Sequence, residues 1–162
     1  MKWLRWWWPV LVWAALIVGF STDAFSGEHT SRVILPILRW LFPHAAAATL
    51  ARLHHLIRKA AHVGEYFVFS LLLVRGVRGE RSGWRAEWAL AALAIAAGWA
   101  GLDELHQTFV PSRGPSMRDV LIDVCGAAAG QLAFAAVALF RSRPSGAGPD
   151  APLGSAESNG AS

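Results

Sequence analysis

The apolar residues of this chain gather in four long stretches that are separated by short polar segments. The stretches cover residues 1–20, 56–74, 86–109 and 118–140. Each is close to the ~20 residues that a helix needs to cross a bilayer. A shorter apolar stretch at 32–42 is more typical of an interfacial or re-entrant segment, and residues 45–56 predict a short helix leading into the second span. The pattern predicts an all-α polytopic membrane protein with four transmembrane helices, plus a short interfacial or re-entrant helix between the first and second.

The two ends of the chain differ in character from its middle. Lys2 and Arg5 precede the first apolar stretch, as in a secretory signal peptide, but the three tryptophans at 6–8 are typical of an interfacial anchor. Because the residues that follow Phe20 offer only a weak cleavage site, we interpret 1–20 as a retained first helix. Residues 144–162 are rich in Pro, Gly, Ala and Ser, which predicts a disordered cytoplasmic tail after one transmembrane domain at 1–143.

Composition supports a membrane protein and limits its partners. Hydrophobic residues make up 54% of the 162 residues and charged residues 16%, and the mean hydropathy is +0.37, which is too apolar for an ordinary soluble domain. The net charge of +4 does not predict nucleic-acid binding, because the basic residues are spread between apolar spans. Anionic lipid headgroups are more natural counterions. The single cysteine, Cys125, excludes an internal disulfide and a cysteine-based zinc site.

The basic residues also predict an orientation in the membrane. With four spans, eight of them fall at one end of the bundle and seven at the other. The set of eight lies in short flanks and loops, where Lys and Arg favour the cytoplasmic side: Lys2, Arg5, Arg75, Arg78, Arg81, Arg85, Arg141 and Arg143. We therefore expect both termini to lie in the cytoplasm. The polar half of the second span and the polar segment between the third and fourth spans would then both face outward.

The second span begins with polar residues that share one helix face. Arg58, His62, Glu65 and Tyr66 are separated by four, three and one positions, which places them on one side of a helix. Lys59 lies beside them and can extend to the headgroups. That explanation does not cover His62 and Glu65, which lie one and two turns deeper.

A second polar segment, at 101–123, lies between the third and fourth apolar stretches. Asp103 shares a helix face with His106 and Gln107, three and four positions on, and Asp119 shares one with Asp123. The remaining candidates in this segment are Glu104 and Arg113. Residues 109–116 contain two prolines and a glycine, which predicts a turn that closes a helical hairpin. Gly126 and Gly130 continue the Asp119 face, where a neighbouring helix could approach closely.

The ionisable groups of this second polar segment could simply cap the ends of two helices. However, the two helix ends do not need all five of them, which are Asp103, Glu104, His106, Asp119 and Asp123. A carboxylate at the end of a span is costly unless it is paired or faces water. We therefore predict one polar cluster at the outer side, in which His62 and Glu65 meet Asp103, His106 and Asp119.

Two blocks of this sequence resemble the VanZ-like family of small bacterial membrane proteins. RKAAHVGEYFVFSLLL at 58–73 is similar to the family pattern R-K-x-x-H-x-x-E-Y, and DELHQTFVPSRGPSMRDVLIDVCGAAAG at 103–130 is similar to D-E-x-H-Q-x-F-x-P-x-R followed by spaced Asp and Gly. The similarity covers roughly residues 6–140 and is weakest before Leu56. It implies a multi-pass protein of the bacterial cytoplasmic membrane and a link to resistance to the glycopeptide teicoplanin. The motif positions carried over have no assigned roles: Arg58, Lys59, His62, Glu65, Tyr66, Asp103, Glu104, His106, Gln107, Arg113, Asp119 and Asp123.

Three functions remain open at this point. The outer polar residues could bind an anionic lipid headgroup or a glycopeptide-type ligand of the cell envelope, because basic side chains suit phosphates. They could instead form a membrane-embedded hydrolase, by acid–base catalysis or with a divalent metal ion held by His62, Glu65, Asp103 and His106. Finally, the charges could form buried ion pairs that only fix helix register. Four spans could be a whole unit or half of a dimer.

Overall fold

The computed structural model describes residues 2–22, 27–109 and 116–142, and all regular structure in these ranges is helical. The helices are α1 (Lys2–Phe20), α2 (Gly27–Leu41), α3 (Ala47–Arg78), α4 (Ala86–Gln107) and α5 (Met117–Arg141). All except α2 are long and apolar enough to cross a membrane. The predicted architecture of four spanning helices and one short extra helix is therefore confirmed. The expected tail at 144–162, most of the expected turn at 109–116, and Arg113 lie outside the described residues.

Helix α3 differs from the prediction, because it joins the expected short helix at 45–56 and the second span into one helix of 32 residues. No glycine or proline interrupts residues 47–63, so nothing in the sequence breaks the helix there. Its length is about 48 Å at 1.5 Å per residue, whereas the hydrocarbon core of a bilayer is about 30 Å thick. The first turns of α3 therefore extend past the spanning part of the bundle.

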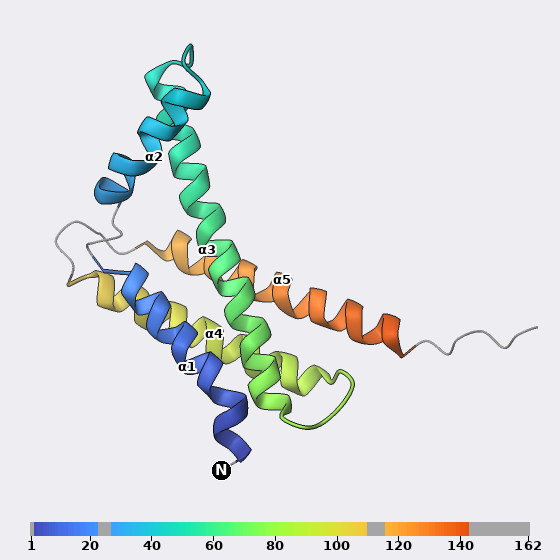
Figure 1. Ribbon diagram of the computed structural model, residues 1–162. Coiled ribbons are helices and arrows are strands. Elements are labelled where there is room, and N and C mark those ends of the chain that lie inside the picture. The colour runs from blue at the N-terminus through green and yellow to red at the C-terminus, as the bar shows by residue number, and fades with distance from the viewer. Residues whose placement is uncertain (1, 23–26, 110–115, 143–162) are drawn as a thin grey trace, which may run out of the picture.

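Helix α3 is the centre of the packing. It contacts each of the other helices, and α4 also contacts α5. Figure 1 shows α3 crossing α1, α4 and α5, while α2 lies along its N-terminal half. Small residues of α4 and large side chains of α3 share the core: Ala92 and Ala96 belong to the same buried cluster as Phe69 and Leu73.

Helices α3 and α5 approach each other closely at two glycines. A Cβ atom added at Gly126 would lie 2.5 Å from the carbonyl oxygen of Val63, and one added at Gly130 would lie 2.7 Å from that of Phe67. The two glycines therefore allow the backbones to meet, as small residues do in membrane helix pairs. The residues next to these glycines add hydrogen bonds between the two helices: Ser70 Oγ donates to the carbonyl of Ala127 at 2.7 Å, and Gln131 Nε2 donates to Ser70 Oγ at 2.6 Å.

The bundle has two ends of different chemistry. Figure 1 shows that α1 and α4 end, and α5 begins, on one side, which we call the polar end. Helix α1 begins, α3 ends and α4 begins on the opposite side, which we call the basic end. There the Arg5 and Arg75 guanidinium groups both lie 5.0 Å from the centroid of the Trp6 ring. Such stacked arginines and tryptophans are typical of a membrane interface.

Candidate functional site

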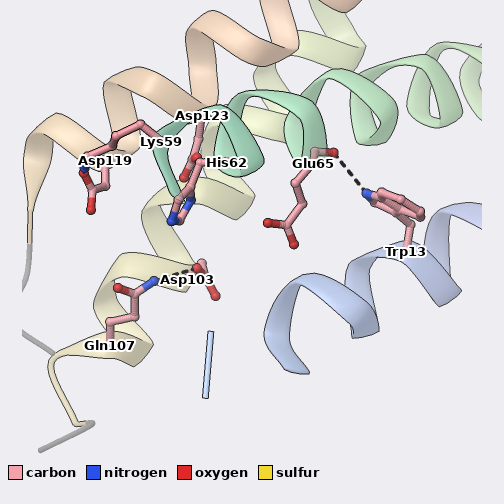
Figure 2. A network of polar contacts seen from close by, with 8 residues as sticks. All are labelled: Trp13, Lys59, His62, Glu65, Asp103, Gln107, Asp119 and Asp123. Atoms are coloured by element: carbon pink, nitrogen blue, oxygen red, sulfur yellow. Dashed lines mark hydrogen bonds and ion pairs between the residues drawn. The ribbon is translucent and has the colours of Figure 1, made fainter. Parts of the chain in front are cut away.

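At the polar end, two basic side chains of α3 pair with two acids of α5. Lys59 Nζ forms an ion pair with Asp119 Oδ1, and His62 Nδ1 lies 3.1 Å from Asp123 Oδ1. The helical spacing explains the arrangement, because Asp119 and Asp123 are one turn apart and face two positions that are almost one turn apart on α3. Figure 2 shows the two pairs side by side between the helices. The first motif block is thus joined to the second by specific contacts.

The end of α4 supplies two further acids with different partners. Gln107 Nε2 donates to Asp103 Oδ2 at 2.9 Å, which fixes the carboxylate from the next turn of the same helix. Glu104 accepts a hydrogen bond from the backbone N–H of Ser116, immediately before α5. A carboxylate at the N-terminus of a helix is favoured by unpaired N–H groups and by the helix dipole. Glu104 therefore connects α4 to the start of α5.

A cavity of about 260 Å³ opens beside these contacts, between α1, α2, α3 and α4. Its polar lining comes mainly from the two motif blocks and includes Arg58, His62, Glu65, Tyr66 and Asp103. Figure 2 shows the carboxylates of Glu65 and Asp103 extending into the space between α3 and α4. The Tyr66 hydroxyl and Asp103 Oδ1 are buried and have no hydrogen-bond partner among the described residues. Buried polar atoms of this kind are costly unless water or a ligand satisfies them.

Two helices that carry no motif complete the cavity. The last turn of α1 and the residue after it contribute Ile17, Phe20 and Ser21, and α2 contributes Thr30 and Ile34. Sequence reasoning missed all five, because nothing in their local pattern says which surface they cover. One contact fixes α1 against the site: Trp13 Nε1 donates to the backbone carbonyl of Glu65 at 3.0 Å. This tryptophan–carbonyl contact, drawn in Figure 2, sets the wall opposite α4.

The structure brings most of the predicted residues together, but it does not bring in His106. Its side chain is exposed at the polar end and does not line the cavity. Arg113 lies outside the described residues. The remaining ten lie at the cavity or in the contacts beside it: Arg58, Lys59, His62, Glu65, Tyr66, Asp103, Glu104, Gln107, Asp119 and Asp123.

The four metal-ligand candidates do not form a site in this arrangement. Within residues 2–22, 27–109 and 116–142, no three His, Cys, Asp or Glu side chains are grouped so that they could hold a metal ion. The reason is visible in the pairing, since His62 uses Nδ1 for Asp123 while His106 points out to the exposed surface. Among the described residues, the four candidates are therefore not gathered into one set of ligands.

Comparison with known proteins agrees with the resemblance seen in the two motif blocks. The sequence model of the VanZ/LLP1 family matches residues 6–140, which includes both blocks, all of α2, α3 and α4, and most of α1 and α5. Searches of curated proteins and of solved structures gave no match. A match over this much of the chain, together with four helices able to span a membrane, leads to one conclusion. The chain is a multi-pass membrane protein that belongs to the VanZ/LLP1 family.

Proposed function

We propose that this protein recognises a polar ligand of the bacterial cell envelope in the cavity at its polar end. The ligand would be an anionic lipid headgroup or a glycopeptide-type molecule, and the cavity would face outward from the cytoplasmic membrane, with both chain termini inside. The observation that carries the proposal is the lining of this cavity, to which Tyr66 and Asp103 each bring a buried polar atom, Oη and Oδ1, that has no partner among the described residues. A ligand with hydrogen-bond donors and acceptors would satisfy both.

The lining residues suggest how such a ligand would be held. Arg58 can bind a phosphate or carboxylate, whereas Glu65 and Asp103 accept hydrogen bonds from hydroxyl or amino groups. The remaining wall is largely apolar and includes Ile17, Phe20 and Ile34. This combination favours a molecule with a polar head and an attached apolar part over a small free ion. The link of the family to teicoplanin resistance is consistent with a ligand of this class.

A structural role is the second candidate, and the two ion pairs favour it. Lys59–Asp119 and His62–Asp123 would fix the register of α3 against α5 even if nothing bound nearby. The two roles differ at Tyr66 and Asp103 Oδ1. A purely structural cluster gains nothing from buried polar atoms that lack partners.

Ligand-induced stabilisation of the purified full chain in nanodiscs tests the proposal. Teicoplanin and glycerol 1-phosphate serve as probes for the two ligand types, and a ligand that binds only the folded state raises Tm. We expect one of them to raise Tm, and Asp103→Asn or Tyr66→Phe to weaken its apparent affinity by about tenfold, the effect of one hydrogen bond in a buried site. The matched control is Glu87→Gln, which changes an exposed acid at the opposite end. Equal affinity in all four proteins, or no response of wild type to either probe, would contradict recognition at this cavity.

A further inference from the structure

A second hollow lies at the basic end and is not part of the site described above. It has a volume of about 710 Å³ and is open to the surface between the start of α1, the end of α3 and the middle of α4. Trp3, Trp7, Val77 and Ile95 give it apolar walls. The Trp3 and Trp7 rings stack with centroids 5.5 Å apart, and Trp3 is 63% exposed. We call this hollow the basic-end groove.

Two arginines stand at this groove, and both are held in place. Arg81 donates from Nε to the carbonyl of Arg78 at 2.9 Å and from Nη2 to that of Val77 at 2.6 Å, so its guanidinium group covers the end of α3. The Arg78 guanidinium carbon lies 5.5 Å from the centroid of the Phe134 ring. Its Nε is buried and has no hydrogen-bond partner among the described residues. The Arg78 guanidinium group thus lies against α5, and Arg78 and Arg81 both border the groove.

The charge around the groove is predominantly positive. Glu80 is the single acid among the lining residues, and it stands against Arg78 and Arg81. Arg5 and Arg75 lie just outside, stacked on Trp6, which is itself part of the wall. Because α1 begins and α3 ends here, the groove reaches the end of two helices that can span a membrane, where a bilayer would change from acyl chain to headgroup.

We propose that the basic-end groove binds one anionic phospholipid. The phosphate would accept hydrogen bonds from Arg78 and Arg81, and an acyl chain would lie along Trp7, Val77 and Ile95. The arginines and the apolar walls together favour a molecule that has both an anionic headgroup and an acyl chain. A free anion would leave the apolar walls uncovered, and a zwitterionic lipid would leave the arginine charges without a net counter-charge. This site is independent of the cavity at the polar end.

Lipid retention by the full chain in mild detergent tests the assignment. The protein is loaded with equal amounts of phosphatidylglycerol and phosphatidylcholine, washed, and the retained lipid is quantified by mass spectrometry. Wild type should retain phosphatidylglycerol in preference. Arg78→Gln should lower its apparent affinity about tenfold, the effect expected for one charged hydrogen bond. Arg85→Gln is the matched control, because that arginine stacks on Trp88 and pairs with Glu87, outside the groove.

A second variant keeps the test decisive if Arg78→Gln does not fold. Ile95→Trp fills the apolar wall, leaves every charge in place, and should also lower phosphatidylglycerol retention. The assignment is overturned if Ile95→Trp retains phosphatidylglycerol like wild type. It is also overturned if, in a competition experiment, glycerol 1-phosphate displaces phosphatidylglycerol equally well from wild type and from Ile95→Trp. Tm shifts caused by ligands at the polar end should be unchanged in both variants, so that failure here is distinguishable from failure of the proposed function.

Discussion

At the level of single residues, Asp123 is the least exposed of the buried acids at the polar end. Its side chain is 5% exposed and faces His62, whose side chain is 19% exposed. An amide in place of this carboxylate keeps the shape but removes the negative charge that the imidazole faces. Removing one partner of a buried pair leaves the other partner with an uncompensated desolvation penalty.

We therefore expect Asp123→Asn to lower the free energy of unfolding by about 1–3 kcal/mol, the usual cost of a buried polar group that loses a charged partner. The control is Glu87→Gln, which breaks the Arg85–Glu87 pair, where both side chains are 59% exposed. An exposed pair of this kind contributes about 0–1 kcal/mol. Denaturant unfolding of both variants in detergent micelles measures the difference. Equal losses would mean that the His62–Asp123 contact adds no more than a surface pair.

Helical spacing placed His62, Asp119 and Asp123 on shared faces, whereas Lys59 was expected to extend to the headgroups and instead pairs with Asp119. Asp119 and Asp123, four apart, could be placed on one face before any partner was known, and their partners Lys59 and His62 lay in the other block. Exposure was harder to predict. His106 shares a face with Asp103 in sequence, yet it is exposed while Asp103 is buried, because the direction of each side chain depends on where α3 and α5 lie.

At the level of helices, the contact between α3 and α5 sets how the two motif blocks meet. Gly126 and Gly130 are spaced one turn apart and lie one and two turns beyond Asp123. They hold the two backbones close enough for the short Asp123 side chain to reach His62. Closely packed membrane helices tolerate little added volume at such positions.

Gly126→Ala should therefore lower the free energy of unfolding by about 1–3 kcal/mol through overpacking, because the new Cβ would lie 2.5 Å from the Val63 carbonyl oxygen. The matched control is Gly98→Ala in α4, where an added Cβ would meet nothing within 4 Å. Alanine is favoured over glycine in a helix by roughly 1 kcal/mol, so this variant should be neutral or more stable. Thermal unfolding in micelles compares them. Unchanged stability in Gly126→Ala would argue against close packing of the backbones.

The helices themselves were largely predictable, because length and apolarity decide which segments span a bilayer. The error at α3 has a physical cause. A short helix at 45–56 was expected to lead into a separate second span, but no glycine or proline between residues 47 and 63 breaks the helix there. The start of α2 at Gly27, five residues before the apolar stretch, was likewise hidden because its first turns are polar.

At the level of the whole molecule, the arrangement separates two kinds of chemistry. The acids and their partners gather at the polar end, and stacked arginines and tryptophans gather at the basic end. No local pattern could have predicted the cavity, because its wall needs α1 and α2, which carry no motif. With both termini in the cytoplasm, as we expect, the polar end faces outward and the basic end meets the inner leaflet.

Thiol labelling of a cavity residue in intact cells tests the outward-facing cavity most directly. Ala61→Cys places a thiol in the cavity lining, in a Cys125→Ala background that removes the exposed native cysteine. The control is Ala92→Cys, at a core position that is 0% exposed. A membrane-impermeant thiol reagent added outside should label Ala61→Cys and leave Ala92→Cys unlabelled. Labelling of Ala61→Cys only after the cytoplasmic face is opened, or no labelling from either side, would contradict an outward-facing aqueous cavity.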